Sequence, residues 1–353
     1  MNENTQLRRV TLKDVASEAG VHYSTASLAL SDSPKLPVAT RKRIQAIAEK
    51  MGYQPDAALS ALNAYRAVKQ SVRFQATLAV VTNHPKPGAW REYFTGAECY
   101  SGLYHQAQRL GYQIEEFSVA GGPAECQRLE KIFRARNITG IIAAPMVAAH
   151  TSLGLDWNKY SAIALGFSLE SPLLHRVASS HLRNTERCML HLTERGYTRI
   201  GFAMLQDIHE RVGRLFGAGY DIVTRRMPEL ESIPFFMPED YASQFTSQAL
   251  KKWIRKHRIQ AVLTSHNGDL LRLLPEAGLR IPHDIAVVNV AAADEKRRET
   301  GMRESNELIG VAAVKLLVSM LQHDERGVPI VPHQTTIDGR WIEGNTVGRI
   351  NKK

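Results

Sequence analysis

After residue 73, short aliphatic runs alternate with amphipathic helical stretches along most of the chain. The runs that read as strands are residues 77–81, 138–143, 162–166, 199–203, 261–264 and 285–290. Repeated strand–helix units of this kind form parallel sheets that helices cover on both faces. The number of units favours two sheets, and we expect the division near residue 179, where a helix from residue 181 opens the second set.

The first 73 residues contain helical patterns only, at residues 11–19, 23–31, 38–51 and 56–62. Thr11 and Asp14 match a capping box at the start of the first helix, and Gly20 permits a tight turn before the second. The third helix is amphipathic, with apolar residues at the spacing of one face: Ile44, Ile47, Ala48 and Met51. This pattern predicts a helix-turn-helix closed by a third helix, with a plain helical bundle as the alternative.

Positive charge is concentrated at the front of the chain. The formal net charge of the 353 residues is +10. Residues 1–73 hold 11 Lys and Arg against 6 Asp and Glu, whereas the remaining residues hold 34 against 29. This density is typical of a segment that meets a polyanion, although basic surfaces also occur on proteins that bind no nucleic acid.

Several functional classes are disfavoured by the sequence. Cys99, Cys126 and Cys188 are widely spaced and suggest neither a disulfide framework nor a metal site. No metalloprotease, serine hydrolase, P-loop or dinucleotide-binding motif occurs, so we expect no enzyme activity and no cofactor. The polar N-terminus and the lack of a long apolar stretch disfavour an exported binding protein or a membrane protein. We expect a cytoplasmic protein.

Four segments near the N-terminus resemble the headpiece of the lactose/purine repressor (LacI/GalR) family: Val10–Val21, Ser24–Ser27, Thr40–Arg41 and Gly52–Pro55. The resemblance implies a bacterial transcriptional regulator, most simply a repressor, with residues 8–54 as its DNA-binding domain. It further implies a homodimer that places the second helix of each headpiece in the major groove of one operator half-site.

The family pattern assigns roles to residues of the headpiece. It places the base-reading positions on Tyr23 and Ser24, with Leu28 one turn further on as an apolar contact, for example to a thymine methyl. Packing of Leu28 against the third helix is the alternative. Thr25 and Ser27 match phosphate-contacting positions, and the remaining expected DNA contacts are Thr11, Thr40 and Arg41.

Residues 55–73 resemble the family's hinge and linker. A helix as short as residues 56–62 does not form alone in water, so the resemblance implies that it folds against a second subunit and the DNA minor groove. Leu62 matches the leucine that wedges into a base step. A simple linker is the alternative.

The rest of the chain resembles the family's periplasmic-binding-protein-like core, with two Rossmann-like lobes and a small-molecule effector, such as a sugar or a related metabolite, in the cleft between them. We expect one lobe from residues 74–178 with 302–325, and the other from 179–301 with 326–345, including a strand at 333–343. Ligands of such sheets bind after the carboxyl ends of strands. The effector candidates there are His84, Trp90, Tyr93, Phe94, Met146, Phe167, Arg214, His266 and Asn267.

Some of these candidates have alternatives, and two expected carboxylates are missing. Arg214 matches the family's Arg-x-x-Gly segment, with Arg211 as its rival, and the aromatic candidates are equally typical of a core. Where relatives carry an aspartate after the last of these strands, this chain continues with three alanines, 291–293, and at the family's Val-x-x-Asp it has Ser180. A standard sugar effector is therefore in doubt. The alternative is a constitutive DNA-binding regulator whose cleft has lost effector sensing.

Overall fold

The computed structural model describes residues 10–30, 36–53, 76–265, 267–292 and 299–349. The chain divides into two compact units, residues 1–74 with 319–325 and residues 75–318 with 326–353. We call the described part of residues 10–53 the headpiece and that of residues 76–318 and 326–349 the core. The expected hinge, with Leu62, lies outside the described residues. Within those residues, no helix is both long and apolar enough to cross a membrane.

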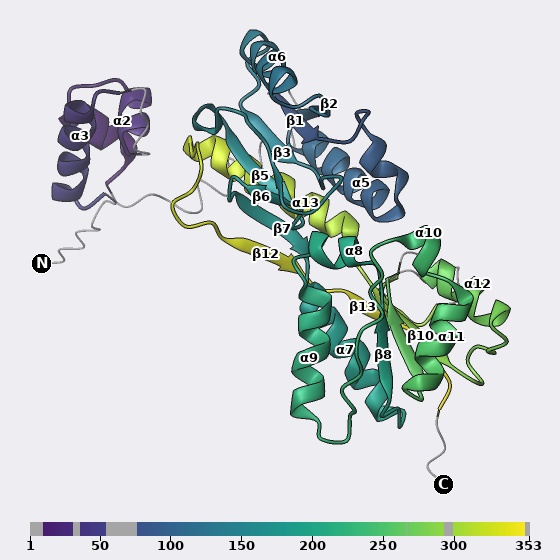
Figure 1. The fold of residues 1–353 in the computed structure, drawn as a ribbon. Helices are drawn as coiled ribbons and strands as arrows, with labels where there is room; N and C mark the ends of the chain where they lie inside the picture. Colours follow the sequence, from purple (N-terminus) through teal and green to yellow (C-terminus); the bar gives the residue numbers. More distant parts are fainter. Residues whose placement is uncertain (1–9, 31–35, 54–75, 266, 293–298, 350–353) are drawn as a thin grey trace, which may run out of the picture. The chain divides into compact units, whose positions relative to one another are not determined.

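The headpiece contains the three helices predicted from the sequence: α1 (Leu12–Glu18), α2 (Tyr23–Leu30) and α3 (Val38–Lys50) (Figure 1). Their buried side chains are small on α1 and α2 and larger on α3, namely Val15, Ala16, Ala19, Ala26, Ala29, Ile44 and Ala48. Because alanines have little side chain to separate the helix axes, α1 and α2 approach closely, and Ile44 fills the space that remains.

The first lobe of the core is built on a six-stranded sheet in the order β12-β7-β5-β3-β1-β2. Its strands are β1 (Ala76–Thr82), β2 (Tyr112–Ser118), β3 (Gly140–Ala143), β5 (Ser161–Leu165), β7 (His175–Ser179) and β12 (Gln334–Ile337). All five pairings are parallel. The central strands are almost wholly buried, which explains why they appear in the sequence as continuous aliphatic runs.

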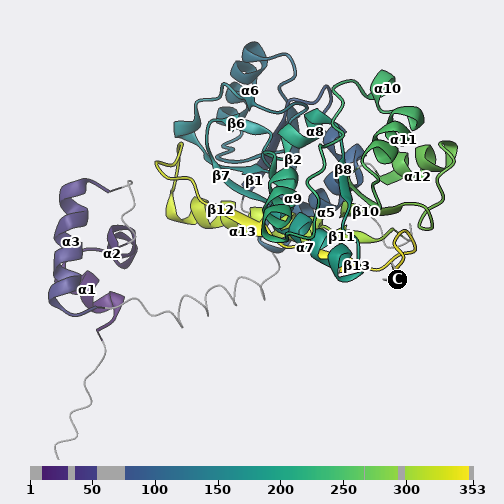
Figure 2. The same ribbon diagram turned by 60° about the horizontal axis from the view of Figure 1, so that its bottom comes forward.

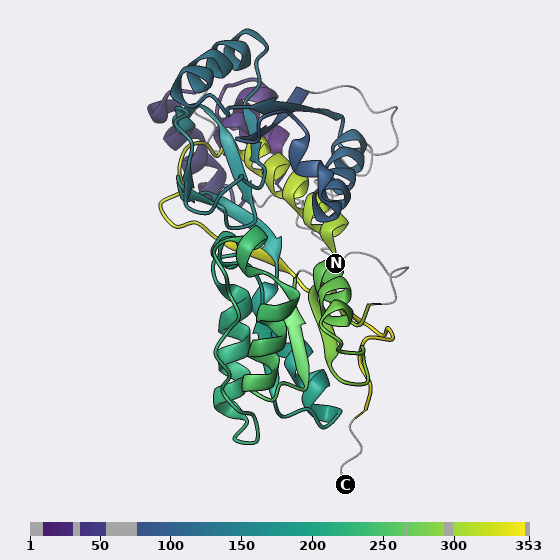
Figure 3. The same cartoon turned by 45° about the vertical axis from the view of Figure 1, so that its right-hand side comes forward.

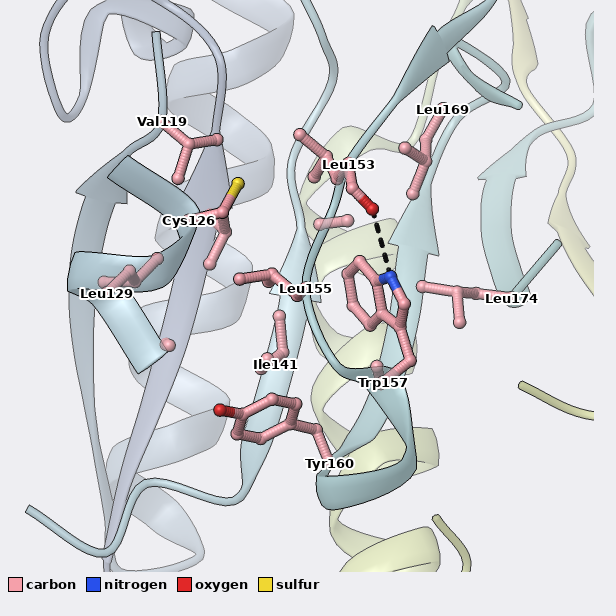
Figure 4. Close-up of a cluster of buried hydrophobic side chains, with 14 of the residues drawn as sticks. Val119, Cys126, Leu129, Ile141, Leu153, Leu155, Trp157, Tyr160, Leu169 and Leu174 are labelled. Atoms are coloured by element: carbon pink, nitrogen blue, oxygen red, sulfur yellow. Dashed lines mark hydrogen bonds between the residues drawn. The ribbon is translucent and has the colours of Figure 1, made fainter. Parts of the chain in front are cut away.

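Helices cover both faces of this sheet. On one face, α6 (Pro123–Ala135) and the short helix η2 (Trp157–Lys159) enclose a cluster of apolar side chains, shown in Figure 4. The indole Nε1 of Trp157 donates to the Leu153 carbonyl over 3.1 Å, so this buried polar group is satisfied. Strands β4 (Thr151–Ser152) and β6 (Leu169–Ser171) form a separate two-stranded sheet.

Helices α5 (Phe94–Arg109) and α13 (Asn306–His323) also belong to the first lobe (Figure 3). They cross at two glycines with no room for a side chain. A Cβ on Gly102 would lie 2.0 Å from the Glu307 carbonyl oxygen, and one on Gly310 would lie 2.1 Å from the carbonyl oxygen of Cys99. The two backbones are therefore in direct contact.

The second lobe is built on a five-stranded sheet in the order β13-β11-β10-β9-β8. Its strands are β8 (Ile200–Ala203), β9 (Ala261–Thr264), β10 (Ala286–Ala292), β11 (Gly301–Arg303) and β13 (Arg340–Ile342). All pairings are parallel except the one between β11 and β13.

Helices cover both faces of this second sheet as well. Helices α7 (His181–Glu194) and α9 (Leu215–Arg226) cover one face, and α11 (Ser247–Lys256) and α12 (Asn267–Glu276) cover the other (Figure 2). Among the residues that the structure describes, the remaining helical segments are η1 (Ala89–Glu92), α8 (Gln206–Arg211) and α10 (Tyr241–Gln244).

The chain crosses between the lobes three times, after β7, after β11 and after β12. This differs from the lobe boundaries expected above. Residues 333–343 do not form one strand of the second lobe, because β12 pairs with the edge strand β7 of the first sheet and only β13 reaches the second. Likewise, residues 302–303 lie in β11 of the second sheet. Two short edge strands thus replace the single strand that was predicted.

Candidate nucleic-acid interface and inter-lobe site

The capping box predicted at the start of α1 is present. The Thr11 main-chain N–H donates to the Asp14 carboxylate over 2.7 Å, and the Asp14 N–H donates back to the Thr11 hydroxyl over 3.4 Å. These bonds satisfy donors that the first helical turn leaves without intrahelical partners. After α1, Gly20 adopts a left-handed φ of 62°, and the Val21 N–H reaches the Ala16 carbonyl over 3.0 Å. The turn into α2 is therefore closed by the backbone itself.

Two side chains of α3 hold the carboxyl ends of the other helices. Arg43 Nη1 donates to the Ala19 carbonyl over 3.1 Å, and Gln45 Nε2 donates to the Ala29 carbonyl over 3.0 Å. Helix α3 thus satisfies carbonyls at the ends of α1 and α2 while Ile44 packs between them. This arrangement fixes the orientation of α2 within the headpiece.

The N-terminal end of α2 is exposed on the surface of the headpiece. Tyr23 is 51% exposed, and Ser24 and Ser27 are exposed as well. Thr25 and Leu28 are half-buried, so Leu28 packs in part and remains in part accessible. Of the other predicted DNA contacts, Thr11 is exposed, and Thr40 and Arg41 are half-buried at the start of α3. The predicted base readers therefore share an accessible, polar end of one rigidly held helix.

In the core, the structure brings together three of the predicted effector residues. His84 follows β1, Met146 follows β3 and Phe167 follows β5, all at the carboxyl ends of strands of the first sheet. The His84 ring donates to the Pro145 carbonyl, and the Met146 N–H donates to the Ser168 hydroxyl over 2.8 Å. We call this group of residues, together with Arg211, the inter-lobe site.

Arg211 belongs to the second lobe but contacts the first. It lies at the end of α8, and its Nη2 donates to the Met146 carbonyl over 2.9 Å. Burial lowers the pKa of His84, and the nearby positive charge of Arg211 lowers it further. His84 is 8% exposed, so the inter-lobe site holds a neutral imidazole beside a guanidinium. The third residue of the site, Phe167, packs against Arg176. The guanidinium carbon of Arg176 lies over the Phe167 ring, 5.2 Å from the ring centre.

The other effector candidates do not join this group. Trp90 is 2% exposed, and its Nε1 donates to Glu116 over 2.8 Å, as expected of a core residue. Tyr93 is 63% exposed. The side chain of Arg214 is 66% exposed and pairs with Glu210 at 2.7 Å, whereas its rival Arg211 contacts Met146 of the first lobe. His266 and the side chains of Phe94 and Asn267 lie outside the described residues.

Sequence reasoning missed a second contact between the lobes. The His150 ring lies between two carboxylates, with Nδ1 3.2 Å from Glu170 and Nε2 3.4 Å from Glu210. Glu210 lies on α8 of the second lobe, whereas His150 directly precedes β4 and Glu170 lies in β6 of the first lobe, so this contact also joins the lobes. His150 stands alone in the sequence, with no neighbouring pattern that would have singled it out.

The three crossings are tied together by buried polar groups that were not predicted either. Asn184, fully buried, donates to the Ser179 hydroxyl over 3.3 Å and accepts from the Gly339 N–H over 3.0 Å. His181 Nδ1 lies 3.0 Å from the carboxylate of Glu304, both side chains being nearly buried. Burial raises the pKa of Glu304, but His181 and Ser179 more than offset this, so the pKa of Glu304 lies below its ordinary value.

Comparison with known proteins agrees with both parts of the structure. Residues 11–56 match the family of bacterial regulatory proteins of the lacI type, and residues 189–347 match the periplasmic binding protein-like domain. The transcriptional regulator GalR of Salmonella typhimurium (strain LT2) is 24% identical over 289 residues, covering 79% of this chain and 78% of that protein.

Two solved structures share the fold. The lac repressor dimer bound to operator and the anti-inducer ONPF superposes with a TM-score of 0.57 at 20% identity, covering 96% of this chain and 99% of the other. A complex of the transcriptional regulator CelR with cellobiose gives a TM-score of 0.56 at 19% identity, covering 96% and 100%. Together with the headpiece and the two-lobed core, these matches place the protein: it belongs to the lacI family of bacterial regulatory proteins and is a DNA-binding transcriptional regulator.

Proposed function

We propose that this regulator binds a pseudo-palindromic operator as a homodimer, represses transcription there, and changes its DNA affinity when a small-molecule effector binds at the inter-lobe site. The observation that carries the proposal is the exposed start of α2, which presents Tyr23 and Ser24 from a rigid three-helix unit. A helix held in this way enters the major groove and reads base edges with its N-terminal residues.

The proposed contacts of the headpiece with DNA are of two kinds, those to base edges and those to phosphates. The hydroxyls of Tyr23 and Ser24 hydrogen-bond base edges, and the accessible part of Leu28 offers an apolar contact. Thr25 and Ser27 contact phosphates, as do Thr11, Thr40 and Arg41. Phosphate contacts set the register of the headpiece on the duplex and carry no sequence information.

A surface of the core supports the homodimer. Tyr104 on α5 is 39% exposed and Leu308 at the start of α13 is 55% exposed. The two helices are in backbone contact through Gly102 and Gly310. The lac repressor structure, in which a dimer is bound to operator, supports the same assembly here, with Tyr104 and Leu308 as exposed apolar side chains for such an interface to cover.

The inter-lobe site has two polar atoms that no described residue satisfies, His84 Nε2 and Arg211 Nε. His84 Nε2 donates or accepts according to the tautomer of the ring, and a ligand hydroxyl suits either, whereas the Arg211 Nε–H is a donor. A buried polar group without a partner costs about 1–3 kcal/mol. A ligand that brings a hydroxyl to His84 and an oxygen acceptor to Arg211 removes this cost. Sugars, sugar acids and sugar phosphates all meet the requirement.

One observation favours a second candidate function, a constitutive regulator without an effector. Arg211 and Glu210 already join the two lobes through Met146 and His150. A protein whose lobes are held together by its own side chains does not need a ligand to reach a single arrangement. In this case the core would serve only to hold two headpieces at a fixed spacing.

Thermal unfolding and DNA titration together separate the two functions. The full chain is incubated with a matched panel consisting of a neutral sugar, the corresponding acid and the corresponding phosphate. An effector present at 100 times its Kd stabilises the core by about 2.7 kcal/mol and also shifts the affinity for a selected DNA site. DNA binding that no member of the panel changes supports the constitutive regulator, and an absence of sequence-specific binding contradicts both functions.

A further inference from the structure

The residue before α2 caps the helix with an imidazole. The His22 carbonyl accepts from the N–H groups of Thr25 and Ala26 over 2.9 and 3.1 Å, so His22 is the N-cap. Its Nδ1 lies 3.4 Å from the main-chain nitrogen of Ser24 and 2.8 Å from the Ser24 hydroxyl oxygen. An N-cap side chain ordinarily accepts the N–H of the second or third helical residue. Here the imidazole ring does so, and it also meets the side chain of that residue.

These two contacts determine where the protons lie. The main-chain N–H of Ser24 can only donate, and its 3.4 Å contact with His22 Nδ1 therefore favours the tautomer in which Nδ1 carries a lone pair rather than a proton. The Ser24 hydroxyl, 2.8 Å from the same Nδ1, must then donate its single proton to it. The Ser24 oxygen keeps two lone pairs for an outside partner and has no proton left to offer.

We propose that His22 is a positioning residue that turns Ser24 into a reader of amino groups, so that the operator carries adenine or cytosine where Ser24 contacts it. This rests on the proposed role of Ser24 as a base reader. In the major groove, adenine and cytosine present amino donors, whereas guanine and thymine present acceptor oxygens. A free serine hydroxyl contacts either kind. One whose proton is held by His22 only accepts, and it therefore favours an amino group.

Capping alone would have a different consequence. A cap stabilises the helix equally on every DNA sequence, so its loss weakens binding to all sequences by the same factor. The proton held by His22 acts at one base position only. The two roles can therefore be separated by measuring base preference rather than overall affinity.

Four forms of the full chain test the proposal: the wild type, Ser24→Ala, His22→Gly and His22→Asn. Glycine is nearly as good an N-cap as the polar residues, but it has no side chain and releases the Ser24 hydroxyl. Asparagine keeps an acceptor at the place of Nδ1. Circular dichroism establishes that each headpiece is folded. A DNA site is first selected with the wild type, and all four base pairs are then placed at each position of both half-sites.

The position at which Ser24→Ala abolishes discrimination is the one that Ser24 contacts. There the wild type is expected to prefer adenine or cytosine over guanine or thymine by about two- to tenfold per half-site, the worth of one hydrogen bond. His22→Gly should lose this preference and His22→Asn should keep it. The proposal is overturned if the wild type prefers guanine or thymine there, if His22→Gly keeps the preference, or if Ser24→Ala alters no position. If the wild type selects no site at all, the proposed operator binding fails, and this inference fails with it.

Discussion

Arg211 Nη2 donates a hydrogen bond to the main-chain oxygen of Met146 over 2.9 Å, from the end of α8 in one lobe to the loop after β3 in the other. Its neighbour Glu210 makes a second crossing to His150 at 3.4 Å. Any change in the separation of the lobes must break or re-form these contacts. The inter-lobe site is thus the part of the core that responds most directly to lobe movement.

Replacing Arg211 by methionine should abolish the stabilisation of the core by any effector that binds at this site. The variant loses the donor that faces the ligand together with the bond to Met146. Without ligand, we expect it to lower the free energy of unfolding by about 1.5–3 kcal/mol, the worth of a hydrogen bond from a charged group. Chemical denaturation with and without ligand measures both effects.

Arg214→Met is the matched control for this prediction. The Arg214 side chain is 66% exposed and pairs with Glu210 on the surface. Exposed ion pairs contribute about 0–1 kcal/mol, so this variant should retain the ligand response and nearly all of the stability. If Arg211→Met and Arg214→Met lose equal amounts of ligand-induced stabilisation and of unfolding free energy, Arg211 does not contact the ligand.

The buried pair of His181 and Glu304 should make the core sensitive to acid. Because the pKa of Glu304 is lower in the folded chain than in the unfolded one, its ionised form stabilises the fold above the unfolded pKa of about 4.3. This stabilisation is lost as the pH falls through the folded pKa. The thermal unfolding midpoint should therefore fall more steeply in the wild type than in Glu304→Gln as the pH is lowered from about 5 to about 3.

Glu194 provides the comparison. Its carboxylate lies 3.7 Å from His191 in a similar pair, but its side chain is 72% exposed. Glu194→Gln should leave the pH dependence of the wild type unchanged. If the unfolding midpoint of the wild type does not change with pH below pH 5, the buried pair of His181 and Glu304 does not have the role given to it.

The crossing of α5 and α13 should not tolerate a methyl group. In Gly310→Ala, the new Cβ would lie 2.1 Å from the Cys99 carbonyl oxygen, which forces the helices apart. Overpacking of this kind costs about 1–3 kcal/mol or more, to be measured by calorimetry. Gly154→Ala is the control, since an added Cβ there meets nothing within 4 Å. If Gly310→Ala unfolds at the same midpoint temperature as Gly154→Ala, the close approach of α5 and α13 is contradicted.

DNA affinity should fall steeply with salt, because the headpiece contacts phosphates. A plot of log K against log salt concentration should have a slope of about −0.9 for each phosphate neutralised. Arg41→Ala should reduce the slope by about 1 while weakening all sequences alike. Arg109→Ala, an exposed substitution on α5 of the core, should leave the slope unchanged. If Arg41→Ala also leaves it unchanged, Arg41 contacts no phosphate.

The elements that the sequence predicted are those with a strong local signal. The capping box at Thr11, the left-handed glycine at position 20 and the aliphatic runs buried on both faces all persist in the structure. Strand β2 has a weaker aliphatic pattern, because its middle residues, Glu115 and Glu116, are charged and only partly buried at the sheet edge. Strands β11 and β13 are three residues long, too short to display a period.

The inter-lobe site was harder to predict because it depends on a turn. Spacing alone could not decide between Arg211 and Arg214. After Arg211, two consecutive residues have a left-handed backbone conformation, Gly213 with φ 67° and Arg214 with φ 61°. This turn leaves Arg211 facing Met146 and directs Arg214 to Glu210. Contacts between residues far apart in sequence, such as Asn184 with Gly339, leave no local pattern at all.

Selection of binding sites from random duplex DNA by the full chain tests the central claim most directly. If two headpieces read DNA through α2, the enriched sequences should share a two-fold symmetric site whose half-sites lie about one helical turn apart, or a multiple of it. The same site should lose enrichment when Tyr23 and Ser24 are both replaced by alanine. Enrichment of no sequence, or of an asymmetric one that the double variant binds equally well, would contradict the account.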